Sequence, residues 1–284
     1  MTNPTETAPP GKERPDATNR RGAAIQLDRI HHGFFHKHEF VRAVWDLSLS
    51  IEPGELLSVV GPSGCGKTTI LGMVAGLLSP RLGSVKVDNE SVTGPRSDIA
   101  YMQARDALMP WRNVRQNVEL GLQVHGVPAR QRADKAQEWI ERVGLADFAD
   151  SRIAQLSQGM RQRVAIARTL AQEPRCILMD EPFAALDAQT RALQQQEFLR
   201  LWSEQGATVI FVTHDLPEAI LLGDRVMLMS HRPGQIVADL KIHLPRPRAT
   251  EMQYEDTTFL EYRAELTHML AVEVDKARKA GVAP

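Results

Sequence analysis

Apolar residues follow two different periods along this chain, and the order of these periods predicts its elements. Residues 25–30 and 44–51 alternate apolar and polar positions, which is typical of two or three short antiparallel strands. Residues 55–60 form a compact apolar run that predicts a strand, and residues 67–78 have helical character. The sequence therefore predicts a strand, a glycine-rich loop and a helix in direct succession.

A block of helical periodicity interrupts the strands that follow. Over residues 114–150 apolar positions recur at helical spacing, with Gly126-Val127-Pro128 as a break, which predicts an inserted helical lobe. Beyond the lobe we expect a helix from about Ser157, a strand at residues 176–179, a helix from about Ala188 and a strand at residues 208–212. This alternation predicts a parallel sheet with crossover helices.

The two ends of the chain differ from its middle. Residues 1–24 are rich in Pro, Thr and charge and lack an apolar run, which predicts a disordered extension and no secretory signal. Apolar residues at helical intervals over 254–280 predict a packed C-terminal helix. The predicted organisation is an extension at 1–24, a domain at 25–245 with a helical subdomain inserted at about 104–156, and a helical extension at 246–284.

Composition excludes several classes of protein. The 284 residues are 43% hydrophobic and 24% charged, which suits one larger globular domain or a core with an inserted lobe. The formal net charge of -1 lacks the positive footprint of a dedicated nucleic-acid binder, so we expect no nucleic-acid partner. No apolar run approaches the roughly 20 residues that a membrane-spanning helix requires. Cys65 and Cys176 have no metal-ligand neighbours, and we interpret both as reduced cytoplasmic thiols.

The glycine-rich loop carries the first chemical motif. Residues 61–68 read GPSGCGKT and match GxxxxGK[ST], in which backbone N–H groups and a helix N-terminus surround phosphate oxygens. Lys67 would reach the β- and γ-phosphates, and Thr68 would offer its hydroxyl to Mg²⁺. The predicted phosphate-binding residues are Gly61, Pro62, Ser63, Gly64, Cys65, Gly66, Lys67, Thr68 and Thr69. This motif alone leaves kinases, GTPases, helicases and transport ATPases open.

Polar residues follow two of the predicted strands. The strand at residues 176–179 ends in Asp180 and Glu181, at the sheet edge where open α/β folds bind ligands. Asp180 would hold Mg²⁺ through its water shell, and Glu181 would polarise the water that attacks the γ-phosphate. An isolated acidic pair would be interpreted as an ordinary turn. His214 follows the strand at residues 208–212, and a lone histidine there is more often structural than catalytic.

The octapeptide LSQGMRQR at residues 156–163 decides between these alternatives. It resembles the LSGGQ-type signature of ATP-binding-cassette (ABC) ATPases and lies between the phosphate loop and the acidic pair, as in that family. It departs from the usual pattern at Gln158 and Met160, where glycine and glutamine are usual. The resemblance covers about residues 25–244. It implies an α/β fold: a RecA-like P-loop NTPase core with a mixed or parallel sheet, an N-terminal antiparallel β-subdomain and an inserted α-helical subdomain.

The resemblance also assigns roles to single residues. His214 matches the histidine that contacts the γ-phosphate, and Gln103, after the strand at residues 98–102, matches the glutamine that senses Mg²⁺ and the attacking water. Asp187 belongs to a loop that resembles the one reaching across to a partner subunit. The implied catalytic residues are Glu181, His214 and Gln103, and the implied Mg²⁺ residues are Thr68, Gln103 and Asp180.

The signature implies a second chain. Its serine and backbone N–H groups would cap a helix and point outward, which suits an anion. In the family that anion is the γ-phosphate held by the opposite subunit, so Ser157, Gln158 and Gly159 would complete the site of a second copy or of a homologous ATPase. The resemblance therefore implies two MgATP at a head-to-tail dimer interface.

One aromatic residue is a candidate for stacking on the adenine base. Alignment of the opening strands with the family pattern selects Phe34, although an aromatic there could equally belong to the core. The nearby histidines suggest a metal cluster, but no Cys or acidic ligand is interleaved at a structural-site spacing, so we predict a solvated hairpin. These histidines are His31, His32, His36 and His38.

The segment LMPWRNV at residues 108–114 narrows the family. Together with the MRQR ending of the signature it resembles the nitrate/sulfonate/taurine importers, a group that includes thiamine-precursor and bicarbonate-related members. The resemblance implies an ATP-hydrolysing subunit, peripheral at the cytoplasmic face of the bacterial inner membrane. It would bind a permease coupling helix near Pro110 and Trp111 and act indirectly with a solute-binding protein. Trp111 could instead belong to the core of the lobe.

Two rival functions remain at this point. A soluble ABC ATPase acting on nucleic acid predicts a basic face, which the net charge does not favour. A regulator that binds ATP without turnover predicts the loss of Glu181 or His214, and both are present.

Overall fold

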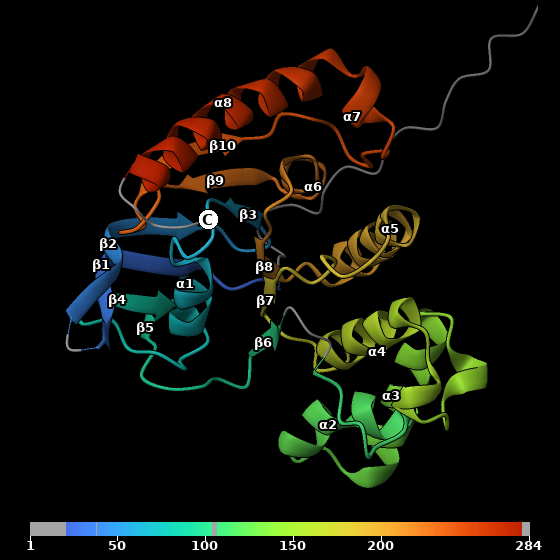
Figure 1. Cartoon of the computed structure of the whole chain (residues 1–284). Coiled ribbons are helices and arrows are strands. Elements are labelled where there is room, and N and C mark those ends of the chain that lie inside the picture. The colour runs from blue at the N-terminus through green and yellow to red at the C-terminus, as the bar shows by residue number, and fades with distance from the viewer. Residues whose placement is uncertain (1–20, 38, 104–106, 280–284) are drawn as a thin grey trace, which may run out of the picture.

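A six-stranded sheet forms the centre of the molecule in the computed structural model, which describes residues 21–37, 39–103 and 107–279 (Figure 1). Its strands lie in the order β10-β9-β3-β8-β7-β6, and all neighbours are parallel except the antiparallel pair β9 and β10. The strands are β3 (Leu56–Val60), β6 (Ile99–Met102), β7 (Cys176–Asp180), β8 (Thr208–Val212), β9 (Arg225–Met229) and β10 (Ile236–Lys241). The predicted parallel sheet is confirmed.

A second, antiparallel sheet has the order β2-β1-β4-β5. Its strands are β1 (Ile25–His36), β2 (Glu39–Ile51), β4 (Leu82–Val87) and β5 (Glu90–Ser91). The opening residues therefore form two long strands, and two later strands, which the sequence pattern did not predict, complete the sheet. Helix α1 (Lys67–Val74) ends before the expected residue 78, because Gly76 adopts a left-handed φ of 72° that stops the helix.

Side chains on the central strands alternate between two hydrophobic clusters. On β8, Val209 and Phe211 join a cluster with Phe198, whereas Ile210 and Val212 join a cluster with Ile70 of α1. This alternation follows from the two-residue period of a strand. Both faces of the sheet are therefore covered, by α1 and the antiparallel sheet on one side and by α5 (Ala188–Gln205) with the helical lobe on the other.

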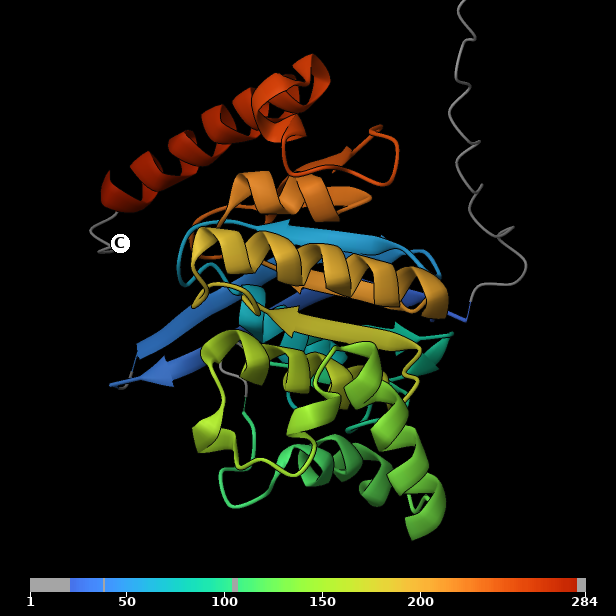
Figure 2. The ribbon, with the colours of Figure 1, turned by 90° about the vertical axis from the view of Figure 1, so that its right-hand side faces the viewer.

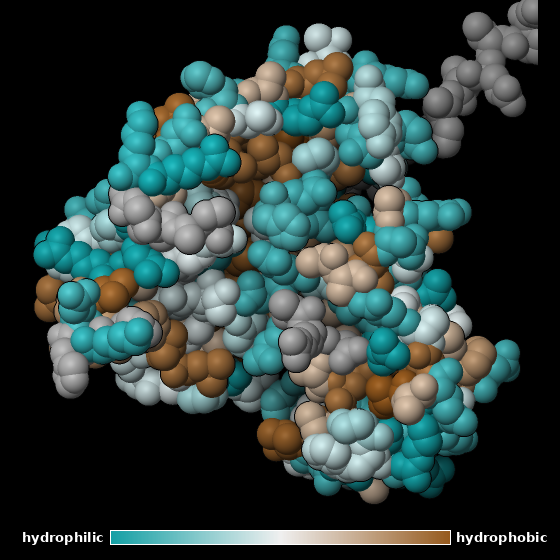
Figure 3. All heavy atoms as spheres, viewed as in Figure 1, coloured by the Kyte–Doolittle hydropathy of each residue, from teal (hydrophilic) through white to brown (hydrophobic). Residues whose placement is uncertain are grey.

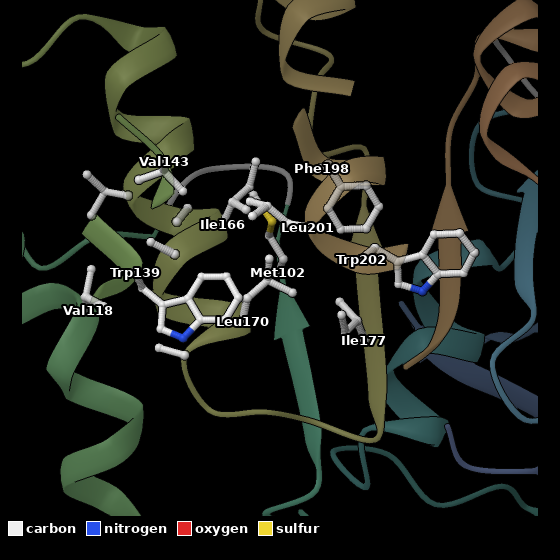
Figure 4. Packing of buried hydrophobic residues seen from close by; sticks show 14 of the residues in the cluster. Met102, Val118, Trp139, Val143, Ile166, Leu170, Ile177, Phe198, Leu201 and Trp202 are labelled. Carbon is white, nitrogen blue, oxygen red and sulfur yellow. The ribbon is translucent and has the colours of Figure 1, made fainter. Parts of the chain in front are cut away.

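The helical lobe shares its core with the sheet. It consists of α2 (Val114–Val124), α3 (Ala129–Arg142), two short 3-10 segments (Ala146–Phe148 and Ile153–Gln155) and α4 (Gln158–Leu170). Asn113 caps α2 by accepting a hydrogen bond from the Gln116 N–H at 2.8 Å. Trp139 of α3 and Ile166 of α4 pack in one cluster with Met102 of β6 (Figure 4). This shared core fixes α4 against the sheet.

The C-terminal residues form two helices in place of one. Helix α7 (Met252–Glu255) precedes α8 (Thr257–Lys279), and residue 280 lies outside the described residues. Phe259 and Leu266 of α8 are fully buried in a cluster that includes Ile220 of α6 (Leu216–Leu222). In Figures 1 and 2, α8 lies on the opposite side of the molecule from the helical lobe. The predicted packing of a C-terminal helix is thus present.

Part of the segment expected to be disordered is described. Residues 1–20 lie outside the described residues, but the Ala23 N–H donates to Arg175 O at 3.1 Å and the Ala24 N–H donates to Asp88 Oδ1 at 2.9 Å. Residues 23 and 24 are thus hydrogen-bonded to the rest of the domain. Within the described ranges, none of the helices has the length and apolar character needed to cross a membrane.

Candidate functional site

Backbone conformation explains the glycines of the phosphate loop. The loop runs from the end of β3 to Lys67, the first residue of α1. Gly64 and Gly66 have left-handed φ values of 74° and 105°, and a Cβ at Gly66 would lie 2.7 Å from Val44 Cγ2. Any other residue would be strained at Gly66 and would collide with β2. The loop is therefore a backbone cradle whose N–H groups precede a helix N-terminus.

Lys67 lies inside this cradle. Its Nζ donates to the carbonyl oxygens of Gly61 at 2.8 Å and Pro62 at 3.1 Å, and the residue is 8% exposed. The loop carbonyls thus hold the ammonium group next to the cradle, where its positive charge favours the binding of phosphate oxygens. Cys65 is buried, and this burial raises the pKa of its thiol, so the side chain fills space as a neutral group.

Thr68 and Asp180 come together from different elements. Thr68 Oγ1 donates to Asp180 Oδ2 at 2.9 Å, and the Tyr101 hydroxyl lies 3.4 Å from the same oxygen. Burial, and then the charge of Glu181, raise the pKa of Asp180 despite the Thr68 hydrogen bond. Burial beside Asp180 raises the pKa of Tyr101 to about 12, so Tyr101 stays a donor. A hydroxyl and a carboxylate next to a phosphate loop are a donor set that fits Mg²⁺.

Glu181 and His214 form a second pair at the same sheet edge. His214 Nδ1 lies 3.2 Å from Glu181 Oε2, and the histidine side chain is 65% exposed. Glu181 has a left-handed φ of 47°, which is costly for a side chain of this size, and its N–H donates to Val212 O at 2.9 Å. This backbone conformation aims the carboxylate toward the loop that follows β8.

An open pocket joins these elements. Its volume of about 530 Å³ lies in the range typical of small-molecule sites. Phe34 lines it and is 45% exposed, so the alternative that Phe34 belongs to the core is wrong. The other lining residues are Val41, Ala43, Ser63, Gly64, Gly66, Lys67, Thr68, Thr69, Glu181 and Arg232. The pocket therefore has an aromatic wall, a phosphate cradle and an acidic group.

The signature residues lie outside this pocket. Ser157 caps α4, and its Oγ accepts a hydrogen bond from the Met160 N–H at 3.3 Å; Ser157 and Gln158 are both exposed. A Cβ at Gly159 would lie 3.0 Å from Thr190 Cγ2, and the Thr190 N–H donates to Asp187 Oδ1 at 3.0 Å. The signature and the Asp187 loop are thus neighbours, and neither lines the pocket of its own chain.

Gln103 is an exposed residue directly after β6. The residues that follow it, 104–106, lie outside the described residues, and Gln103 does not line the pocket. Its predicted role in sensing Mg²⁺ remains a prediction.

Two groups of residues at or next to the site were not predicted from the sequence. Tyr101 and Arg232 lie at the site, but neither belongs to a motif. Thr213, just before His214, donates to Glu218, which also accepts from Gln195 Nε2 at 2.7 Å. Thr213 could have been predicted, because polar residues directly follow the buried strands β7 and β8 of the central sheet. Nothing in the sequence pattern predicted a role for Arg232.

The histidines near Phe34 differ from the prediction. His32 is buried and its ring lies 4.8 Å from that of Phe34, while the ring of His31 lies 4.5 Å from that of Trp45. Burial lowers the pKa of His32. Both residues lie on β1 of the β1–β2 hairpin, and the expected solvated environment is wrong for His32, which is buried, whereas His31 is partly exposed. His38 and the side chain of His36 lie outside the described residues, and no metal-binding group of His, Cys, Asp or Glu occurs among the described ones.

Pro110 and Trp111 lie at the surface of the helical lobe. Trp111 is 69% exposed, and its carbonyl oxygen accepts from Arg152 Nη1 at 2.7 Å. The alternative that Trp111 belongs to the core of the lobe is therefore wrong. Hydrophobic surface is visible over this lobe and beneath α8 in Figure 3.

Comparison with known proteins agrees with this geometry. The ABC transporter family model matches residues 44–184. An ABC transporter ATP-binding protein of Methanocaldococcus jannaschii is 47% identical over 92% of this chain and 96% of its own length. The taurine import ATP-binding protein TauB of Yersinia pestis is 44% identical over 74% of this chain and 83% of its own length.

Solved structures give the same result. A dimeric post-hydrolysis structure of the ATP-binding cassette MJ0796, bound to ADP and Pi, is 32% identical with a TM-score of 0.69, covering 78% of this chain and 100% of that one. The mixed sheet, the antiparallel sheet and the inserted helices are those of an ABC ATPase. On these identities and coverages, the chain belongs to the ABC transporter family, as an ATP-binding subunit of its ATP-hydrolysing transport ATPases.

Proposed function

We propose that this ATPase is the motor subunit of an importer that takes up a small anion, with a taurine-like sulfonate as the first candidate. The observation that carries the proposal is the division of the site. The phosphate loop and Glu181 line one pocket, Asp180 accepts a hydrogen bond from Thr68 and His214 lies beside Glu181, whereas Ser157 lies exposed outside the pocket. A sequence identity of 44% to a taurine import ATP-binding protein supports the choice of solute.

The pocket and the residues beside it offer a group for each task in ATP hydrolysis. The loop N–H groups and Lys67 bind the phosphates, and Phe34 stacks on the base. Thr68 and Asp180, with Gln103, would hold Mg²⁺, and the ion would neutralise phosphate charge when bound. Glu181 accepts the proton of the attacking water. His214 contacts the γ-phosphate and orients the Glu181 carboxylate through its Nδ1.

The site is complete only in a dimer. Ser157, Gln158 and Gly159 present a helix N-terminus and a capping hydroxyl that suit an anion, yet they lie away from the pocket of their own chain. We infer that they reach the γ-phosphate of a second copy, or of a homologous chain, beside Asp187. Two MgATP would then lie at a head-to-tail interface. The dimeric form of MJ0796 supports this arrangement by analogy.

The helical lobe would bind the permease. Trp111 and Pro110 are exposed where α2 begins, and an exposed indole suits a groove for a partner helix. The chain would then be peripheral at the cytoplasmic face of the inner membrane, and a solute-binding protein would act through the permease.

Uptake by the assembled transporter tests the proposal. The permease is identified by cross-linking and co-purification from native membranes, and the complex is reconstituted into vesicles with MgATP inside and the solute-binding protein outside. We expect ATP-dependent uptake of labelled taurine. Uptake of nitrate, bicarbonate or a thiamine precursor in place of taurine would change the assigned solute and leave the importer assignment intact. ATP hydrolysis without any co-purifying membrane protein would overturn the importer assignment.

A further inference from the structure

The segment of residues 230–235, here called the 230–235 loop, connects β9 to β10 and is tied to β2. The Gly234 N–H donates to Ala43 O at 2.8 Å, and the Trp45 N–H donates to Gly234 O at 3.1 Å. Gly234 also packs against the phosphate loop, since a Cβ there would lie 2.0 Å from the Cys65 carbonyl oxygen. The 230–235 loop is therefore fixed directly beside the phosphate loop.

This attachment places Arg232 at the nucleotide pocket. Arg232 Nε donates to Gly64 O at 3.3 Å, and its exposed side chain lines the pocket together with Phe34 and Lys67. No carboxylate of the described residues forms an ion pair with this guanidinium. Arginine has five N–H donors, so most of them are free to meet an anion in the pocket.

The chemistry of the neighbouring groups favours phosphate as that anion. Guanidinium groups bind phosphate oxygens through paired, charge-assisted hydrogen bonds. The Lys67 ammonium donates to the carbonyl oxygens of Gly61 and Pro62, whereas Arg232 donates to the carbonyl oxygen of Gly64 in the same loop. A phosphate chain in the cradle would therefore meet two cations that line the same pocket.

A buried carboxylate of the C-terminal helix holds the 230–235 loop from the other side. Glu273 of α8 is 2% exposed, and its Oε2 accepts from the His231 N–H at 3.1 Å. Its Oε1 accepts from Lys276 Nζ at 2.5 Å. Burial of a carboxylate is costly unless such donors satisfy it. Since His231 directly precedes Arg232, this contact fixes the backbone that carries the arginine.

We propose that Arg232 is a further nucleotide-binding residue, which donates hydrogen bonds to the phosphate chain of the bound nucleotide, and that Glu273 is a positioning residue that holds the 230–235 loop for this contact. The proposal rests on the assignment of the ATP site to this pocket. It makes the C-terminal extension a determinant of nucleotide affinity, although α8 does not line the pocket.

Displacement of a fluorescent ADP analogue from the full chain by ATP, ADP and adenosine tests the role of Arg232. We expect Arg232→Gln to weaken ATP and ADP about 10-fold, as loss of a charged hydrogen bond does, and to leave adenosine unchanged. Arg232→Lys keeps the charge without the planar fork and should recover part of the affinity. Unchanged ATP and ADP affinities in Arg232→Gln, or an equal loss for adenosine, would overturn the proposal.

Two controls separate this proposal from the assignment of the site. Lys67→Ala removes a cradle residue and should abolish binding of ATP; if it binds ATP normally, the pocket itself is wrongly assigned. Arg278→Ala removes a cation from α8 whose guanidinium lies 4.0 Å from Asp275, and it should leave every affinity unchanged. Loss of binding in Lys67→Ala with normal binding in Arg232→Gln refutes the Arg232 contact alone.

The positioning role of Glu273 predicts coupling to Arg232. Glu273→Ala should lower ATP affinity as much as Arg232→Gln, and the double variant should lose no more. Glu273→Gln keeps an acceptor oxygen for the His231 N–H and should bind ATP nearly as wild type does. Glu273→Asp withdraws the carboxylate by one methylene, so a smaller loss is expected if the Ala variant does not fold. A lowered Tm with unchanged ATP affinity would assign Glu273 to stability only.

Discussion

His214 Nδ1 lies 3.2 Å from Glu181 Oε2, although the two residues follow different strands of the central sheet. Parallel strands end at one edge, so residues after β7 and β8 become neighbours there. The left-handed backbone of Glu181 turns its carboxylate to this edge. In the proposed function, this pair would place a general-base carboxylate beside an imidazole at the phosphate end of the site.

Removal of the Glu181 charge should stop turnover and spare binding. We expect Glu181→Gln to lower the rate of ATP hydrolysis about 10²- to 10⁴-fold, because the amide cannot accept the proton of the attacking water. Phosphate release and nucleotide titration measure the two properties separately. Glu173→Gln, at an exposed residue paired with Lys135, is the matched control and should keep full activity. Normal hydrolysis by Glu181→Gln would exclude Glu181 as the general base.

Replacement of Gln158 tests the departure from the usual signature. Gln158 is the exposed first residue of α4, outside the pocket of its own chain. We expect Gln158→Gly to change steady-state ATP hydrolysis by about 2- to 10-fold, an effect on the order of 1 kcal/mol, and to leave nucleotide binding by the single chain intact. Kinetics indistinguishable from those of the wild type would remove the reason to single out this residue.

Truncation of Trp111 should uncouple transport from hydrolysis. Trp111 is 69% exposed and belongs to none of the hydrophobic core clusters of the described residues, so Trp111→Ala should change the free energy of unfolding by about 0.5 kcal/mol or less. Solute uptake by the reconstituted complex should fall strongly, while nucleotide binding stays intact. Val124→Ala removes another exposed apolar side chain of the same lobe and serves as the control. Unaltered assembly and uptake in Trp111→Ala would reject the docking role.

Burial of Glu218 predicts a pH-dependent stability. Burial raises its pKa above the ordinary 4.5, although the hydrogen bonds from Thr213 and Gln195 act in the opposite direction; Asp215 raises it and Arg191 lowers it. A raised carboxyl pKa means that the folded state favours the protonated form, so this stabilisation is complete below about pH 4.5 and is lost as pH rises through the folded-state pKa.

The isosteric variant isolates that contribution. The free energy of unfolding of the wild type, relative to that of Glu218→Gln, should fall as pH rises above 4.5, since the amide does not titrate. Denaturant unfolding at a series of pH values measures the difference. A difference that is constant with pH would show that Glu218 is held charged by its partners.

Much of the site follows from short, contiguous motifs. The glycines that precede Lys67 predicted the cradle, because glycine adopts the left-handed φ values of this loop without the strain that a side chain would add. Ser157 predicted the start of α4, since a serine hydroxyl satisfies a free N–H at a helix N-terminus. Such features depend on residues that are neighbours in the sequence, so their local structure can be predicted without knowledge of the fold.

The sequence by itself therefore determined the cradle, the acidic pair, the capped signature helix and the alternation of strands and helices. Only the tertiary structure decided that β4 and β5 complete the first sheet, that Phe34 lines the pocket and that Glu273 of α8 holds the loop of Arg232. The reason is physical: these contacts join residues far apart in the chain, and their geometry is set by how whole elements pack around the shared core.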